Sequence, residues 1–417
     1  MKMNTFMLED KDIVCIGLPA WDGNYEKSTI KLMSQLAKRN RVLYVEYAYT
    51  YKDIFSTWFG KQQAPVGRVL GTSNRLRKIS LPENSFIHIL TPPPVLSVNH
   101  IKNPAKYKRL LFSNGRKIQR AVTQAMRKLN IKNPVMINAF NPFVGLPMLN
   151  QIGESATLYY CYDEISACTW TKNHGKLLEE EYISKVDGVI VSSDGLLQTK
   201  SLLTDNCYLV KNGVDFAHFN KAADLRNKNK TADITVGYIG SLDNRIDYDL
   251  VAHLAEQLTD VKFEFVGRIV EKSKVAKLDK LPNTKFWDSK RMEELPDFLK
   301  RFDAGIIPFL KNEQTAGIYP MKMNEYLAAG IPVISTDFAS FSEFGSFISV
   351  TSGQDAFVQG VVENLCNDTP EKRKQRIALA QGNSWEKRGE QFGAAVASVL
   401  VKKGVMSEAT HHAGIMV

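Results

Sequence analysis

The residues with the clearest chemical potential lie in the segment 317–334. Pro320 is suited to the first turn of a helix, because the N–H group that proline lacks would have no partner there. The other amides of that turn and the helix dipole form an anion site, and Lys322 adds a full positive charge beside it. Glu325, one turn further on the same face, can accept hydrogen bonds from both hydroxyls of a ribose. The spacing therefore predicts a site for a nucleoside diphosphate.

Two arginines could stabilise the charge that develops on a departing nucleotide. Arg245 follows a β-rich run and a glycine turn, and Arg268 follows the next such run, directly after Gly267. Because a guanidinium can bind a diphosphate with two hydrogen bonds, we predict Arg245 as a catalytic residue and Arg268 as a donor-binding residue. The alternative for Arg245 is a salt bridge to Asp247 or Asp249. No Asp-x-Asp motif stands at a strand end, so we expect no metal and no other cofactor.

Carboxylates in the first half of the chain are candidates for a general base. Asp163 and Glu164 directly follow an apolar run, and a carboxylate there could take the proton of an acceptor hydroxyl. Asp163 is the predicted catalytic base, and the alternative is that it caps the following helix. A loop after the first apolar run offers Trp21, Asp22 and Asn24 as acceptor-binding residues, and Asp22 is a lesser candidate for the base.

Parallel strands are needed to bring these residues together, and the chain predicts two series of them. A chain of 417 residues is too long for one compact core. A β-rich run at 12–21, a helical pattern at 27–40 and a β-branched run at 41–47 predict a strand, a helix and a strand. Further strands are expected at 86–90, 135–140, 156–163 and 186–193, and a helix at 114–130.

The second series follows a polar stretch at 221–233, which we interpret as a surface connection. Gly330 and Pro332 predict the end of the helix that Pro320 begins. Strands are expected at 234–241, 261–267, 284–288, 304–309 and 331–336. The fold class is therefore α/β, with two Rossmann-like, doubly wound domains facing an interdomain cleft where the carboxyl ends of the strands meet.

The segment 320–333 resembles a known signature, P-x-K-x-x-E-Y-x-A-x-G-x-P-V, of the group 1 glycosyltransferases of GT-B fold. Further likeness to these enzymes lies in YYCYDEISA, VDGVIVSSDGL, VKNGVDFAHF, VGYIGSLDNRIDYDLV, LPDFLKRFDAGIIPF and NSWEKRGEQF, in this order. The resemblance implies an acceptor-binding domain at 1–210, a nucleotide-sugar-binding domain at 211–383 and a helix at 384–404 that returns to the first domain. It also implies that the donor contacts Tyr319, Pro320, Met321, Lys322 and Glu325.

The stereochemical outcome stays open at this point. The family's Glu-x7-Glu pair is incomplete, because the position eight residues before Glu325 is Gly317, which has no carboxylate. The Met-Lys pair at 321–322, with a hydrogen-bonding residue three positions after the lysine, is also similar to bacterial exopolysaccharide glucuronosyltransferases. Those enzymes invert the anomeric configuration and sit on the inner membrane, so both retention and inversion are compatible with the resemblance.

The charge of +10 is concentrated in the first half of the chain. Between Ile54 and Gly153 there are fifteen Lys/Arg residues and one acid, Glu83. Such a patch attracts anionic lipid, phosphorylated acceptors or nucleic acid, and the alternative is a merely solvated helix face. Six aromatic residues at 47–59 would suit a membrane interface, although a core-facing loop would have the same composition. No apolar run is long enough to span a bilayer and no export signal is evident, so we expect a cytoplasmic protein, peripheral on the inner face of the membrane.

The leading hypothesis is a metal-independent glycosyltransferase that passes a sugar from a UDP- or GDP-sugar to a membrane-associated saccharide or lipid-linked acceptor, in cell-surface polysaccharide or glycolipid synthesis. A GT-B-fold nucleotide-sugar epimerase is the alternative, and it would need no basic acceptor face. Nucleic-acid binding is suggested only by the charge, without a helix-turn-helix, RNP or zinc signature, so we expect no nucleic-acid partner. The five scattered cysteines predict neither a zinc site nor a redox pair.

Overall fold

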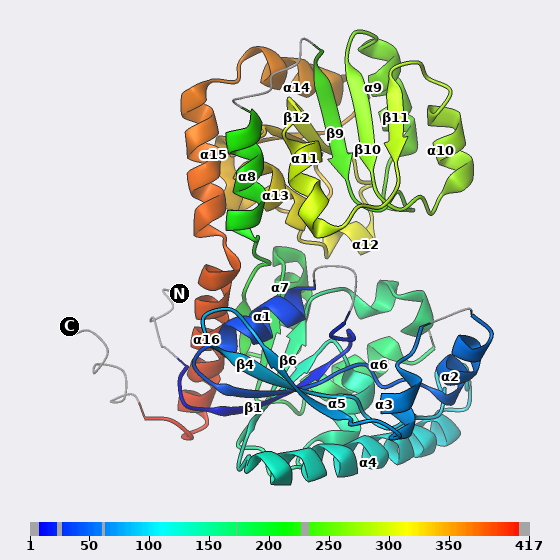
Figure 1. Ribbon diagram of the computed structural model, residues 1–417, viewed down its shortest axis with the longest axis vertical. Helices are drawn as coiled ribbons and strands as arrows, with labels where there is room; N and C mark the ends of the chain where they lie inside the picture. Colours follow the sequence, from blue (N-terminus) through cyan, green and yellow to red (C-terminus); the bar gives the residue numbers. More distant parts are fainter. Residues whose placement is uncertain (1–7, 23–26, 61–62, 172, 227–232, 408–417) are drawn as a thin grey trace. The chain divides into compact units, whose positions relative to one another are not determined.

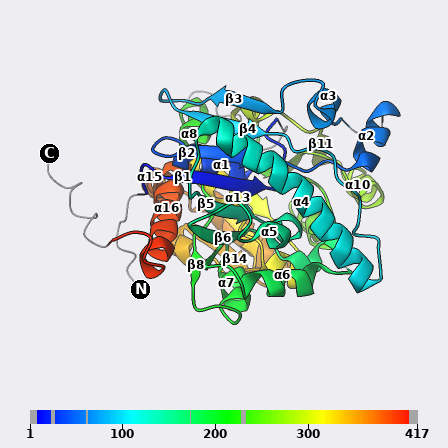
Figure 2. The same ribbon diagram turned by 90° about the horizontal axis from the view of Figure 1, so that it is seen from below.

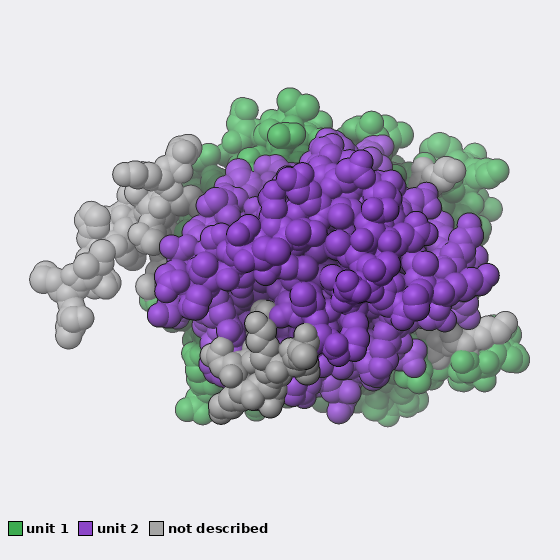
Figure 3. Space-filling model, turned by 90° about the horizontal axis from the view of Figure 1, so that it is seen from above, with its two compact units in different colours: residues 1–211, 388–417 green, residues 212–387 purple. Residues whose placement is uncertain are grey.

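The computed structural model describes residues 8–22, 27–60, 63–171, 173–226 and 233–407. The chain forms two compact units, which Figure 3 shows in different colours. Unit 1 comprises Met1–Lys211 and Arg388–Val417, and unit 2 comprises Asn212–Lys387. The chain thus passes from one unit to the other twice.

Unit 1 is built on an eight-stranded sheet in the order β3-β4-β2-β1-β5-β6-β7-β8 (Figure 1). Neighbouring strands are parallel except for β3 and β4, which are antiparallel. The strands are β1 Asp12–Gly17, β2 Arg41–Val45, β3 Leu76–Ser80, β4 Phe86–Leu90, β5 Val135–Ala139, β6 Ala156–Cys161, β7 Gly188–Val191 and β8 Cys207–Leu209.

Two of these strands, β3 and β8, were not predicted. Both lie at an edge of the sheet, where a strand pairs on one side only and needs no continuous apolar run. β3 forms a hairpin with β4 through a turn in which Glu83 and Asn84 have φ of 59° and 56°. It also carries two cations, Arg77 and Lys78, so it lacks the apolar pattern from which the other strands were predicted.

Helices of unit 1 cover the sheet. They are α1 Ser28–Leu36, α2 Tyr51–Trp58, α3 Val66–Leu70, α4 Pro104–Leu129, α5 Pro142–Met148, α6 Gly175–Ile183 and α7 Asp194–Lys200, with 3-10 turns η1 Ile165–Ala167 and η2 Thr169–Thr171. α4 is ten residues longer at its start than predicted, because Asn103 caps it by accepting a hydrogen bond from the Lys106 amide and Pro104 occupies its first position. Figure 2 shows α4 lying across one face of this sheet.

Unit 2 contains a parallel six-stranded sheet in the order β11-β10-β9-β12-β13-β14. The five predicted strands of the second series are confirmed, and β14 is an additional edge strand. The strands are β9 Thr235–Ile239, β10 Lys262–Val266, β11 Thr284–Trp287, β12 Ala304–Ile307, β13 Val333–Thr336 and β14 Ile348–Thr351. The α/β prediction, with two sheets of Rossmann-like topology, is therefore confirmed.

The helices of unit 2 come before, between and after these strands in the sequence. They are α8 Phe216–Arg226, α9 Tyr248–Gln257, α10 Lys272–Leu278, α11 Leu295–Leu299, α12 Glu313–Ala316, α13 Met321–Ala328, α14 Gln354–Cys366 and α15 Pro370–Gly382, with 3-10 turns η3 Met292–Glu294 and η4 Ser342–Phe347. The predicted helix after Pro320 is α13.

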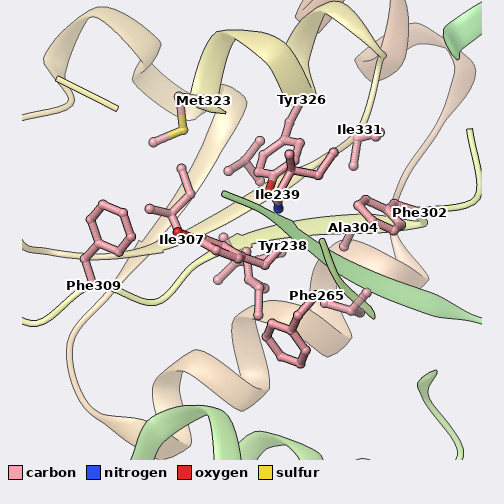
Figure 4. Close-up of a cluster of buried hydrophobic side chains, with 14 of the residues drawn as sticks. Tyr238, Ile239, Phe265, Phe302, Ala304, Ile307, Phe309, Met323, Tyr326 and Ile331 are labelled. Atoms are coloured by element: carbon pink, nitrogen blue, oxygen red, sulfur yellow. Dashed lines mark hydrogen bonds between the residues drawn. The ribbon is translucent and has the colours of Figure 1, made fainter. Parts of the chain in front are cut away.

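The core of unit 2 holds α13 against the centre of the sheet (Figure 4). Tyr326 of α13 is fully buried, and its hydroxyl oxygen accepts a hydrogen bond of 2.8 Å from the Ile239 amide at the end of β9. Its ring packs so close to Gly305 of β12 that a Cβ at that position would lie 2.7 Å from it. Burial of a large side chain of this kind stabilises the fold by about 1.5–3 kcal/mol. The helix is thereby fixed relative to the end of β9 and to the first half of β12.

The last long helix, α16 Trp385–Lys402, contains the second passage between the units, because its residues from Arg388 onward belong to unit 1. There, Phe392 packs edge-on against Tyr160 of β6 at 5.3 Å between ring centroids. In unit 2, Val214 and Ser384 form a parallel bridge beside both passages. Within the residues that the structure describes, no helix has the length and apolarity that a membrane span requires.

Candidate active site

The start of α13 has the features of an anion site. Pro320 has an extended backbone, with φ −78° and ψ 105°, and is the N-cap residue; the prediction that placed it inside the first turn was off by one position. Proline has no side-chain oxygen that could accept hydrogen bonds from the helix amides. The amides of Met321 and Lys322 therefore have no acceptor within the helix and are available to an anion.

Two glycines make room for the side chain of Lys322. Gly240, directly after β9, has φ of +142°, and a Cβ there would lie 2.1 Å from Cε of Lys322. Gly267, directly after β10, has φ of +154°, and a Cβ there would lie 2.1 Å from the carbonyl oxygen of Gly240. Because other residues carry a Cβ, only glycine permits this close packing of the lysine on the strand ends.

The ammonium group of Lys322 lies above aromatic rings and among other charges. Its Nζ is 5.6 Å from the ring centroid of Tyr238 and 5.9 Å from that of Phe309. Burial lowers the pKa of Lys322, as does the positive charge of Arg245, whereas Glu325 and Asp243 raise it; the result is a pKa of about 8. This lysine is a cation that an incoming diphosphate would stabilise in its charged form.

Arg245 is brought into the same cluster and is held by a carboxylate. Its Nε and Nη2 donate to the two oxygens of Asp243 at 2.8 and 2.7 Å, and its guanidinium lies 5.2 Å from the ring centroid of Phe309. Burial opposes the ionisation of Asp243, but the hydrogen bonds and charge of Arg245 outweigh it and lower the pKa. The alternative of a salt bridge to Asp247 or Asp249 named the wrong partner, and Asp247 instead caps α9 by accepting from the Leu250 amide at 2.9 Å.

Glu325 and Tyr319, which lie on opposite sides of Pro320 in the sequence, differ in their burial and in their partners. Glu325 is half-buried, one turn into α13, and its charge acts on Lys322. Tyr319 is buried, and its hydroxyl contacts the Glu343 carboxylate and accepts a hydrogen bond of 2.7 Å from Asn324. Asn324 in turn accepts a hydrogen bond of 3.0 Å from Asn383. Tyr319 thus anchors the segment before the helix, and its hydroxyl is used inside the protein.

Arg268 is exposed, on the loop after β10. It borders a hollow of about 560 Å³ between α10 and the residues that follow β11. The hollow is also lined by Ile269, Lys272, Val275, Ala276, Asp279, Asp288 and Ser289. The carbonyl of Arg268 accepts a hydrogen bond of 2.9 Å from the Leu242 amide, which ties this loop to the one that carries Arg245.

Trp21 and Asp22, two of the residues predicted to bind the acceptor, contact charged side chains that the sequence analysis did not identify. The Trp21 amide donates to Glu46 at 3.0 Å, and the Trp21 ring packs edge-on against Tyr44. Asp22 forms salt bridges with Arg68 and Arg77 at 3.0 Å each. Asn24, the third predicted residue, lies outside the described residues. Glu46 directly follows β2, so its position after a strand could have identified it, as it did for Asp163.

Asp163 is half-buried after β6, and the helix cap is not its role. Glu164 caps the η1 turn by accepting a hydrogen bond of 3.3 Å from the Ser166 amide, while Asp163 accepts one of 2.9 Å from the Glu164 amide. The capping alternative therefore named the wrong residue. Lys200 binds Glu164 at 3.2 Å and the buried Glu179 at 2.8 Å, and so holds the loop that carries Asp163.

Solved structures with this architecture share the GT-B fold. Starch synthase IV of Arabidopsis thaliana, bound to ADP and acarbose, has a TM-score of 0.62 at 11% identity, covering 94% of this chain and 100% of that one. HepE of Anabaena in complex with UDP has a TM-score of 0.62 at 13% identity, over 93% and 100%. A UDP-forming α,α-trehalose-phosphate synthase of Burkholderia vietnamiensis has a TM-score of 0.67 at 8% identity, over 96% and 100%. The predicted fold is therefore confirmed.

Residues 233–367 match the family model described as glycosyl transferases group 1. The matched residues include the signature at 320–333, so the family model and the signature point to the same resemblance. A Bacillus subtilis (strain 168) protein, TuaH, whose name describes a teichuronic acid biosynthesis glycosyltransferase, is 28% identical over 220 residues. This match spans 48% of the chain and 55% of TuaH. The predicted enzyme class, a glycosyltransferase, agrees with these findings.

Lys322 predicts a pH dependence of nucleotide binding. With a pKa of about 8, its charged fraction falls from about 90% at pH 7 to about 10% at pH 9, and the attraction for a diphosphate falls with it. We expect the Kd for UDP, measured by calorimetry on the full chain, to rise by about tenfold over this range.

Two variants control this measurement. Lys322→Gln should bind UDP more weakly than wild type at pH 7 and show little further change up to pH 9. Lys311→Gln, at an exposed lysine paired with Asp337, should keep the wild-type profile. An unchanged pH profile in Lys322→Gln would show that another group causes the dependence.

Proposed function

We propose that this chain is a glycosyltransferase that passes a sugar from a UDP- or GDP-sugar to a membrane-associated saccharide or lipid-linked acceptor, in the synthesis of a cell-surface polysaccharide or glycolipid. The observation that carries the proposal is the packing of Lys322 on Gly240 at the start of α13, inside the matched family domain. A cation, two helix amides and a carboxylate one turn on are arranged there as a nucleoside diphosphate requires.

In the proposed reaction, an acceptor hydroxyl attacks the anomeric carbon of the donor sugar. The bond from that carbon to the diphosphate oxygen breaks, and the nucleoside diphosphate leaves with the electron pair. Lys322 and the amides of Met321 and Lys322 stabilise the negative charge that develops on the leaving oxygen, with Arg245 as the second cation. Glu325 holds the ribose, and Asp163 is the proposed acceptor of the hydroxyl proton.

No divalent ion is included in this scheme. Among the residues described, no group of three or more His, Cys, Asp or Glu side chains is placed to hold a metal ion. Metal independence stays a prediction, and the cations of the donor site are proposed to do the electrostatic work. Gly317, where the family has its first glutamate, offers no carboxylate, so retention and inversion both stay compatible with the site.

Known ligands of similar structures support the donor class. The structures of HepE contain UDP, and in one case UDP and glucose, while that of starch synthase IV contains ADP and acarbose. The name of TuaH, which places it in teichuronic acid biosynthesis, supports a polysaccharide as the product.

Membrane association is proposed from α2 and α4. Phe55, Trp58 and Phe59 at the end of α2 are 59%, 68% and 64% exposed, while Tyr49 packs inward on Ile54. The predicted aromatic cluster is thus divided between core and surface. α4 contains no acid, and it exposes seven cations: Lys106, Lys108, Arg109, Arg116, Arg120, Arg127 and Lys128. Exposed aromatics beside a basic helix suit an anionic lipid surface on the inner face of the membrane.

Glu325→Ala tests the donor site. In a thermal-shift panel of nucleoside diphosphates and nucleotide sugars, the wild-type full chain should be stabilised by UDP or GDP and their sugars. The variant should lose most of this shift, because the ribose loses its acceptor, with the Kd rising by about tenfold or more. Glu293→Ala, at an exposed glutamate of η3, is the matched control and should behave as wild type. A wild-type protein that no nucleotide stabilises would refute the proposed function.

Trp58→Ala tests the membrane surface. The full chain should float with vesicles that contain anionic lipid, and less so as the salt concentration rises, because salt screens the attraction. The variant should bind about tenfold more weakly, since it loses a large interfacial side chain. Leu202→Ala removes a residue that is 83% exposed on another part of unit 1 and should float as wild type. Flotation that is absent, insensitive to salt or equal in both variants would remove this part of the proposal.

A further inference from the structure

Two arginines of unit 1 meet at one carboxylate beside the carboxyl end of the sheet. Arg68 lies on α3, and Arg77 lies on β3, where it pairs in register with Ile89 of β4. The carboxylate is that of Asp22, in the loop after β1. Three segments that are 46 and 55 residues apart in the sequence thus bring their charges together.

Both guanidinium groups form salt bridges with the Asp22 carboxylate. Nη2 of Arg68 donates to Oδ2 of Asp22 at 3.0 Å, and Nη1 of Arg77 lies 3.0 Å from the same oxygen and 3.3 Å from Oδ1. The Asp22 side chain is 49% exposed, whereas those of Arg68 and Arg77 are 24% and 20% exposed. The carboxylate is therefore the outer member of the group and lies between the arginines and solvent.

Both arginines are held in place by other residues of unit 1. The backbone of Arg68 is held by Arg75, whose Nε donates to the Arg68 carbonyl at 3.0 Å. Arg77 faces the buried Glu46, with 3.7 Å between Nη2 and the carboxylate. Glu46 is itself held by the Trp21 amide and by the Thr91 hydroxyl. The guanidinium groups are thereby preorganised, and little side-chain entropy would be lost when they bind a ligand.

The group has more hydrogen-bond donors and positive charge than its carboxylates satisfy. Nε of Arg68 and both Nε and Nη2 of Arg77 are buried, without a hydrogen-bond partner in the described part of the chain. Lys27 adds a third cation, and its Nζ donates to the Ala20 carbonyl at 3.2 Å. Burial lowers the pKa of Lys27 by more than the charge of Glu46 raises it. Among the residues that the structure describes, these three cations face two carboxylates, those of Asp22 and Glu46, which leaves a net positive charge. A purely structural ion pair would need neither the excess charge nor the unused donors.

We infer that Arg68 and Arg77 form a binding site for a phosphate or diphosphate group of the acceptor, with Asp22 as an internal anion that the ligand displaces. The inference rests on the proposed function, which it extends by naming the chemistry of the acceptor. Two rigid guanidinium groups converging on one oxygen suit a tetrahedral oxyanion, because each can donate two hydrogen bonds to it. Displaced Asp22 moves into solvent, to which it is already half exposed.

The test is calorimetry with inorganic pyrophosphate on the full chain, with UDP present at saturation so that the donor site is occupied. Arg68→Gln and Arg77→Gln should each weaken pyrophosphate binding by about tenfold or more, because each removes a charged donor. Asp22→Asn should act in the opposite direction and tighten binding severalfold, because the competing carboxylate is neutralised. The Kd for UDP should be the same in all three variants.

Opposite effects of Asp22→Asn and the arginine variants cannot arise from general damage to the fold, which would weaken binding in all of them. Pyrophosphate affinity that is equal in wild type and the arginine variants, or that falls in Asp22→Asn, would overturn the inference. If wild type binds neither UDP nor GDP, the proposed function fails, and pyrophosphate binding alone still tests the arginine site.

Two further probes distinguish the sources of such a group. Farnesyl diphosphate binding more tightly than pyrophosphate, in a manner that depends on Arg68, supports the site and assigns it to a lipid-linked acceptor. Glucose 1-phosphate binding more tightly, with the same dependence, supports the site and assigns it to a sugar phosphate. Binding of both probes without any dependence on Arg68 or Arg77 would count against the site.

Discussion

The close packing of Lys322 on Gly240 is the contact on which the donor site depends. It places a flexible cation at a fixed point, where the ends of β9 and β10 meet the start of α13. The contact exists because Gly240 and Gly267 have no Cβ and because Tyr326 holds α13 against β9. The same burial that fixes the lysine lowers its pKa, so the cation is poised to gain from the arrival of a diphosphate.

Unit 1 uses paired charges in the corresponding position, at the carboxyl ends of its strands. The loop after β6 is held by the ion pairs of Lys200 with Glu164 and Glu179, and the loop after β1 is held by Asp22 with Arg68 and Arg77. Lys200 and Glu179 are buried, and a buried charge is costly unless it is paired. Both units therefore present rigid polar groups on loops that parallel strands support, as is general for sheets of this kind.

Much of the fold could be predicted from the sequence, because buried parallel strands are short apolar runs. The strands at 135–140 and 234–241 are examples, and the helix at 320–330 was evident from Pro320 and Gly330. The edge strand β3 could not be predicted in this way, because Arg77 and Lys78 interrupt its apolar residues, and the edge strands β8 and β14 were also missed. Long-range ion partners were equally hidden, because pairs such as Asp22 with Arg77 depend on the order of the strands in the sheet.

The central claim is tested most directly by a crystal structure of the full chain in complex with UDP. This account predicts that the diphosphate lies at the start of α13, with its oxygens within hydrogen-bond distance of Lys322 Nζ and of the amides of Met321 and Lys322, and that the ribose hydroxyls donate to Glu325. A complex in which the diphosphate lies away from Lys322, or in which Glu325 does not contact the ribose, would contradict it.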